Sequence, residues 1–132
     1  MKRILLDTNA YSEYLTGNQD VFHVISKADF VLISVIVLGE LYAGFRGGNK
    51  CRENLEILRR FLSKPTVTDL PITEETSEIF GQTKNNLRIT GTPIPINDVW
   101  IASQAIETGS VLITFDDHFE NVKGLRIWET FK

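Results

Sequence analysis

The sequence has very few of the side chains that bind soft metals or form covalent cross-links. Its 132 residues include one cysteine, Cys51, and two histidines, His23 and His118. A single cysteine excludes an internal disulfide, and so few sulfur and imidazole ligands argue against a structural zinc site. Metal chemistry in this chain would therefore depend on oxygen ligands.

Long apolar runs are also missing. The first apolar run, Ile4-Leu5-Leu6, ends at Asp7 and is too short for the core of a signal peptide, and no segment approaches the roughly 20 residues of a membrane span. We therefore expect a cytoplasmic protein without membrane contact. The chain has no evident linker, repeat or low-complexity segment, and 42% of its residues are hydrophobic, which predicts a single domain over residues 1–132.

Basic residues are slightly fewer than acidic ones, with 14 lysines and arginines against 17 aspartates and glutamates. A net charge of −3 argues at first sight against a nucleic-acid partner. If four acids bind a cation, however, the rest of the chain carries +1, and a local basic patch can hold a polyanion. The candidates for such a patch are Arg46, Lys50, Arg52, Arg59, Arg60 and Lys64. The alternative is a solvated helix face, balanced by Glu53 and Glu56.

Short apolar or β-branched runs alternate with segments of helical spacing along the whole chain. Strands are predicted at 4–6, 30–33, 66–70, 111–114 and 125–128. Helices are predicted at 10–15, 21–25, 35–45, 55–62, 74–87 and 98–105. This alternation predicts an α/β fold, a three-layer sandwich with helices on both faces of a mainly parallel sheet. The first strand, being continuously apolar, belongs near the centre of that sheet.

Polar residues at the predicted helix starts indicate where the strands end. Thr8 or Asn9 is expected to cap the first helix, and Ser34 the helix after the second strand. Thr73 opens a capping box, and Asn97 is expected to cap the helix that follows Pro95.

Four acids fall near the ends of predicted strands. Asp7 ends the first strand, Glu40 lies on the helix after the second, Asp98 starts the helix before the fourth, and Asp116 follows that strand. Taken alone, Asp7 is as easily a turn residue, and Glu40 belongs to the set only if its helical stripe faces the sheet edge. Because parallel strands end at one edge, we expect the four to cluster. Such a cluster needs protonation or a cation, and oxygen ligands favour Mg²⁺ or Mn²⁺. The chemistry that suits it is metal-assisted phosphodiester hydrolysis.

These residues carry a resemblance to a known family. Asp7-Thr8-Asn9, the central Glu40, residues 97–102 and residues 114–119 resemble, in this order, the PIN-domain ribonucleases, particularly the VapC-type toxins of toxin–antitoxin modules. The resemblance implies a Rossmann-like PIN fold and a Mg²⁺- or Mn²⁺-dependent endoribonuclease, commonly dimeric and inhibited by a cognate antitoxin. By position, the metal ligands would be Asp7, Glu40, Asp98 and Asp116, with Asn9 and Thr114 as polar supports. Arg46, Lys50 and Arg52 are then candidate RNA contacts.

Several side chains beside these motifs have two interpretations. Either Asp116 or its neighbour Asp117 could be the fourth ligand, and the family spacing favours Asp116. Trp100 and Phe119 adjoin regular apolar patterns, which indicates core residues rather than stacking platforms for bases. His118 is either a structural or solvated histidine or an aid to proton transfer.

Three other functions compete with the ribonuclease hypothesis. A haloacid-dehalogenase-type phosphatase would need a second aspartate at position 9, where the chain has Asn9. A receiver domain would need a phospho-accepting aspartate at the end of a middle strand, but the run at 30–33 leads into Ser34. A PIN-like module without catalysis, binding RNA or protein, is disfavoured by the intact set of four acids.

Self-association is expected from the helix at 35–45. Tyr42 and Phe45, with the small residues Ala43 and Gly44, leave apolar material beyond one helical stripe. We therefore expect a homodimer.

Overall fold

The computed structural model of the chain describes residues 2–129, and its centre is a parallel sheet of five strands. The strands are β1 (Arg3–Leu6), β2 (Phe30–Ser34), β3 (Val67–Leu70), β4 (Val111–Ile113) and β5 (Arg126–Ile127). Their order is β3-β2-β1-β4-β5, and all four pairings are parallel. The predicted α/β class and the central place of the first strand are confirmed. The last strand is shorter than expected.

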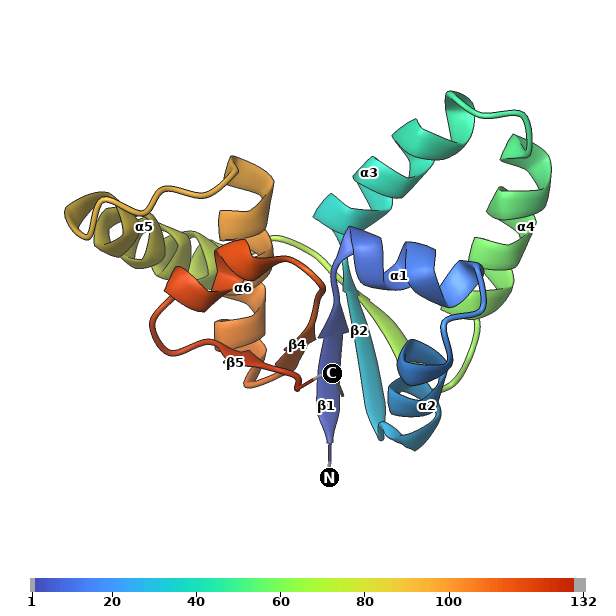
Figure 1. Cartoon of the computed structure of the whole chain (residues 1–132), viewed down its shortest axis with the longest axis horizontal. Coiled ribbons are helices and arrows are strands. Elements are labelled where there is room, and N and C mark those ends of the chain that lie inside the picture. Colours follow the sequence, from blue (N-terminus) through green and yellow to red (C-terminus); the bar gives the residue numbers. More distant parts are fainter. Residues whose placement is uncertain (1, 130–132) are drawn as a thin grey trace.

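Helices cover both faces of the sheet, as predicted (Figure 1). One side carries α1 (Thr8–Leu15), α2 (Gln19–Lys27), α3 (Val35–Arg46) and α4 (Cys51–Leu62), and the other carries α5 (Glu74–Ile89) and α6 (Ile96–Thr108). The chain runs outward from β1 to β3 through the first four helices, then returns on the opposite face to β4. Because parallel crossovers are right-handed, a reversal of direction moves the helices to the other face. Among residues 2–129, no helix is long and apolar enough to cross a membrane.

The core is densest at the central strand. Ile4, Leu5 and Leu6 are fully buried, as are Ile33 and Ile113 on the flanking strands. A strand with helices on both faces has no solvent side, which explains why these runs are continuously apolar and do not alternate with polar residues.

Two predicted helix caps are confirmed. The Ser34 hydroxyl accepts a hydrogen bond from the backbone N–H of Ile36 at the start of α3. At the start of α5, the Thr73 side chain accepts from the N–H of Thr76 while the Thr76 side chain accepts from the N–H of Thr73. These reciprocal bonds satisfy donors that the first helical turn leaves unpaired.

Two other predicted caps are wrong. The cap of α1 is Asp7 rather than Thr8 or Asn9, because the helix already begins at Thr8 and the Asp7 carboxylate accepts from the N–H of Ala10. The cap position of α6 is Pro95 rather than Asn97. Since the Pro95 carbonyl already accepts the first helical bonds, Asn97 lies inside the first turn.

Helices α3 and α4 form a hairpin that extends away from the sheet (Figure 1). On α3, Tyr42, Ala43 and Gly44 are exposed, as expected. The expectation for Phe45 is wrong, because only 9% of this residue is exposed and it packs in the core. Phe61 of α4 holds the hairpin against α1, with its ring centroid 5.3 Å from that of Tyr11.

Replacing Phe61 by alanine should lower the free energy of unfolding by about 3–5 kcal/mol, because Phe61 is 2% exposed and its removal leaves a cavity under α4. Urea denaturation followed by far-ultraviolet circular dichroism measures the change. Ile57→Ala on the same helix, where the side chain is 37% exposed, is the matched control and should cost less than about 1 kcal/mol. Equal costs for both would mean that the α1–α4 contact does not stabilise the fold.

Candidate metal centre

The strand register brings the first and fourth strand ends to the same level. Leu6 pairs with Ile33 on one side and with Ile113 on the other. The next residues, Asp7 and Thr114, therefore lie side by side at the carboxyl edge, and the N–H of Asp7 donates to the Ile113 carbonyl. The two strands are parallel, but the order in which strands are added to the sheet changes direction between β1 and β4. Open α/β sheets form a crevice at such a point.

Asp7 is the deepest acid of the edge, with 5% of the residue exposed. Its Oδ1 accepts from the backbone N–H of Ala10 at 2.8 Å, and its Oδ2 accepts from the Thr114 hydroxyl at 2.5 Å. The same Thr114 oxygen accepts from the backbone N–H of Asp116 at 3.0 Å. Thr114 thus links the carboxylate of Asp7 to the backbone that carries Asp116.

Glu40 faces the same edge, which was the condition for including it among the four acids. Its Oε1 accepts from the Thr8 hydroxyl at 2.5 Å, and its Oε2 accepts from the Asn97 side-chain amide at 3.4 Å. These donors come from the first turns of α1 and α6, so the two helices on either side of the crevice hold one carboxylate between them. Neither donor follows from the sequence patterns. The amide of Asn97 next to Asp98 was the available signal, but it was interpreted as a cap.

Asp98 and Asp116 complete the set from the other side of the crevice. Asp98 lies in the first turn of α6. Asp116 caps a short 3₁₀ helix, η1 (Asp117–Asn121), by accepting from the backbone N–H of His118. The His118 ring also lies against Asp116, with 3.0 Å between Nδ1 and Oδ1. Asp98, Asp116 and His118 each offer a ligand atom within 4.8 Å of the other two.

The four predicted acids border one cavity of about 350 Å³. Its other lining residues are Thr8, Asn9, Pro95, Ile96 and Asn97. The structure therefore brings together Asp7, Glu40, Asp98 and Asp116, with Asn9 on the wall and Thr114 beneath Asp7. Asp117 is exposed and lines a neighbouring hollow together with Asp116, but only Asp116 of the two also borders the acidic cavity.

Burial and mutual repulsion disfavour the charged forms of Asp98 and Asp7. Burial is the main cause that raises the pKa of Asp98 to about 6, and the charges of Asp116, Glu40 and Asp7 raise it further, while His118 lowers it. Burial also raises the pKa of Asp7, against the opposing effect of its bonds from Thr114 and Ala10. An arrangement in which carboxylates resist ionisation together is one that a divalent cation would stabilise. This cluster therefore fits a hard cation with oxygen ligands.

The basic residues Arg46, Lys50 and Arg52 are exposed around the tip of the α3–α4 hairpin. Arg46 follows Glu40 by six residues on α3, which corresponds to about 9 Å along the helix axis. These side chains and the acidic cavity thus lie along one hairpin. Arg59 instead pairs with Glu56 at 3.0 Å on the exposed face of α4, which agrees with the solvated-face alternative.

Of the two aromatic residues beside the motifs, only Phe119 lies in the buried core, as predicted. Phe119 is 1% exposed. Trp100 is partly buried and stacks on Phe80, with 3.9 Å between ring centroids.

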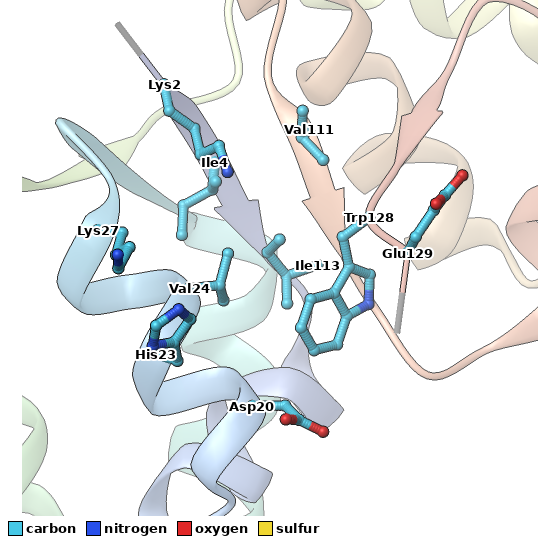
Figure 2. A pocket seen from close by; sticks show the side chains of 10 residues that line it. All are labelled: Lys2, Ile4, Asp20, His23, Val24, Lys27, Val111, Ile113, Trp128 and Glu129. Atoms are coloured by element: carbon cyan, nitrogen blue, oxygen red, sulfur yellow. The ribbon is translucent and has the colours of Figure 1, made fainter. Parts of the chain in front are cut away.

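A second cavity, also about 350 Å³, lies on the sheet face beside α2 (Figure 2). Its apolar lining residues are Ile4, Val24, Val111, Ile113 and Trp128. Its charged or titratable lining residues are Lys2, Asp20, His23, Lys27 and Glu129. In Figure 2, Asp20 and Glu129 come from α2 and from the chain end beyond Trp128, and their side chains do not converge. The four predicted acids line the first cavity instead.

The chain resembles known proteins over nearly all of its length. Residues 4–125 match the sequence model of the PIN domain. The ribonuclease VapC2 of Rickettsia felis is 30% identical over 114 residues, which cover 83% of this chain and 84% of that protein.

Two solved structures have the same architecture. The structure of VapBC2 from Rickettsia felis bound to a promoter DNA fragment contains a chain with a TM-score of 0.84 and 26% identity, covering 96% of this chain and 97% of that one. The VapBC-1 structure from nontypeable Haemophilus influenzae contains one with a TM-score of 0.85 and 25% identity, at the same coverage. With its parallel sheet, its acidic crevice and these similarities, the chain belongs to the PIN-domain family, among its VapC-like members.

Proposed function

We propose that the protein is a metal-dependent endoribonuclease, acting as the toxin of a type II toxin–antitoxin system in the cytoplasm, with residues 1–132 forming one functional domain. The observation that carries the proposal is the convergence of Asp7, Glu40, Asp98 and Asp116 on one cavity of a PIN fold. The similarity to proteins named ribonucleases favours RNA cleavage over a phosphatase reaction.

The four carboxylates would hold the cation, Mg²⁺ or Mn²⁺. When bound, such an ion activates water and stabilises the negative charge on the departing oxygen of a phosphodiester. The surrounding residues orient the carboxylates: Thr114 holds Asp7, while Thr8 and Asn97 hold Glu40. Fixing ligands in this way is the usual role of groups that touch a metal ligand but not the metal.

Arg46, Lys50 and Arg52 would bind the RNA backbone next to the cavity. They are exposed, and the hairpin that carries them begins at the acidic edge with α3. Positive side chains along one path contact phosphates without regard to base identity. They would therefore position an RNA strand rather than choose the sequence to be cleaved.

An antitoxin is the proposed protein partner. The VapBC assemblies among the similar structures support a partner, and the acidic cavity indicates how it would inhibit. A guanidinium group pairs with two carboxylates at once and competes with a cation for the same oxygens. An arginine of the antitoxin would thus enter the cavity.

A homodimer is supported by the exposed stripe of α3. Val35, Gly39, Tyr42 and Ala43 recur at helical spacing and are all exposed, and a side chain added at Gly39 would meet nothing within 4 Å. Small residues beside one aromatic ring form a flat surface that a second helix can approach closely.

Asp98→Asn should reduce Mg²⁺- or Mn²⁺-dependent RNA cleavage by roughly a hundredfold or more while the protein remains folded, since it removes one charge from the ligand set but keeps the side chain's size. Cleavage of a bulk RNA with titrated metal, and its loss with chelator, measures the effect. Asp117→Asn is the neighbouring control and should cleave normally. Wild-type cleavage by folded Asp98→Asn would contradict the four-acid site, and the absence of cleavage by the wild type would favour a binding module.

The same variant should be more stable than the wild type in the absence of metal. Because the pKa of Asp98 is raised from 3.8 to about 6, the folded wild type binds a proton that the unfolded chain releases between these pH values, and its stability falls as pH rises through that range. The advantage of Asp98→Asn should therefore be absent below pH 4 and reach about 1 kcal/mol above pH 6, after discounting for solvent screening of a partly exposed group. Urea denaturation between pH 3.5 and 8 with chelator tests this sign.

Neutralising the acids should weaken antitoxin binding. Glu40→Gln combined with Asp98→Asn removes two negative charges that would pair with a guanidinium group, and each charge-assisted bond is worth about 1.5–3 kcal/mol. Calorimetric titration should give at least a tenfold weaker affinity, whereas Asp117→Asn should bind normally. Unchanged affinity of the double variant would mean that inhibition acts by covering another surface.

Ala43→Arg should convert a dimer to a monomer, because it places a charged side chain in the middle of the exposed stripe of α3. Light scattering at tens of micromolar should give twice the chain mass of 15.0 kDa for the wild type and 15.0 kDa for the variant. Ser26→Arg, on the exposed face of α2, is the control and should remain dimeric. A monomeric wild type would contradict the proposed dimer.

A further inference from the structure

His118 is the one imidazole that joins the acids, and from the sequence it is either a structural or solvated histidine or an aid to proton transfer. Its Nδ1 lies 3.0 Å from Oδ1 of Asp116, and it shares with Asp116 and Asp98 a set of ligand atoms that all fall within 4.8 Å of one another. Its side chain is 55% exposed against 29% for Asp116, so the ring reaches the acids from the solvent side.

The short helix η1 is what turns His118 toward the acids. Oδ1 of Asp116 accepts from the backbone N–H of His118, which closes a tight turn directly after β4. This turn brings the side chain of the second residue after Asp116 back over the carboxylate. Asp117, between them, borders the hollow on the other side. The turn therefore selects His118, and not the neighbouring acid, as the companion of Asp116.

The spacing of the three groups suits a shared ion. For metal–ligand bonds of about 2.1 Å, neighbouring ligands of an octahedral ion lie about 3.0 Å apart and opposite ones about 4.2 Å. The distance of 3.0 Å between His118 and Asp116 equals that of neighbouring ligands. The ligand atoms of the three residues lie within 4.8 Å of one another, which is only slightly more than the distance between opposite ligands. Small side-chain rotations are enough to place all three around one centre.

The kind of ligand decides which ion is preferred. Mg²⁺ binds oxygen almost exclusively, whereas imidazole nitrogen favours transition-metal ions, and Mn²⁺ accepts both carboxylates and imidazole. We infer that His118 supplies a nitrogen ligand to the divalent ion held by Asp98 and Asp116, so that the site prefers Mn²⁺ to Mg²⁺. This inference rests on the proposed function, because it concerns the same metal centre.

A purely orienting role for His118 makes a different prediction. If the ring only held Asp116 by a hydrogen bond, its loss would weaken Mg²⁺ and Mn²⁺ binding alike, since the carboxylate serves both ions. If the ring is instead a direct nitrogen ligand, its loss weakens the binding of Mn²⁺ more than that of Mg²⁺.

The test compares wild type, His118→Asn and His23→Asn by electron paramagnetic resonance of bound Mn²⁺. We expect the electron spin-echo signal of the wild type to show coupling to a ¹⁴N nucleus, which His118→Asn should abolish. Titration of free Mn²⁺ should give an affinity at least about tenfold weaker for His118→Asn, while Mg²⁺ affinity by competition should change less than about twofold. His23→Asn changes the other histidine, which lines the apolar cavity of Figure 2, and should behave as wild type.

Two results would overturn the inference alone. One is Mn²⁺ bound to the wild type without nitrogen coupling, and the other is an equal loss of Mg²⁺ and Mn²⁺ affinity in His118→Asn. In either case the proposed function stands if the protein cleaves RNA with Mg²⁺. Failure of the wild type to bind any divalent ion, together with absence of cleavage, would overturn both.

Discussion

Repulsion between carboxylates at one end of a buried parallel sheet is the constraint on which the rest of the local structure depends. Parallel strands end at a common level, so Asp7 and the residues after β4 are neighbours however far apart they lie in sequence. The protein limits the cost by giving Asp7 and Glu40 neutral donors. Asp7 receives the Thr114 hydroxyl and a backbone N–H, and Glu40 receives Thr8 and Asn97. These bonds fix the positions of the acids without cancelling their charge, which leaves the cavity suited to a cation.

The acids differ in depth, and this difference suggests a division of work within the proposed metal centre. Asp7 is almost fully buried and accepts two hydrogen bonds, so its position is set by the fold. Asp98 and Asp116 are partly exposed and lie on the starts of a helix and a 3₁₀ turn. A buried acid on one side and more exposed acids on the other let a site accept a cation and a phosphate together, while the fold keeps its register.

The sequence predicted the parts of this structure that depend on local apolar patterns. Continuous apolar runs identified β1, β2 and β4, because strands covered on both faces have no polar side. The clustering of the four acids followed from topology alone. The caps of α1 and α6 were mispredicted, since the choice between Asp7 and Thr8, or between Pro95 and Asn97, depends on where a strand or turn ends to within one residue.

Other features could not be predicted because they depend on tertiary packing. Phe45 is buried by the α3–α4 hairpin, whose angle no pattern in the sequence specifies. His118 reaches the acids only because five residues form a 3₁₀ turn, and the cavity of Figure 2 depends on how α2 packs beside the sheet.

The indole of Trp128 donates to the Thr114 carbonyl at 2.6 Å, and the hydroxyl of that same threonine holds Asp7. The only other tryptophan, Trp100, follows Asp98 by two residues on α6. Both indole fluorophores of the chain are therefore attached to the acidic crevice, one through a hydrogen bond and one through a helical turn. Intrinsic emission will consequently report events at the crevice without any added label, and quenching of one indole can be separated from the other by a single Trp→Phe exchange.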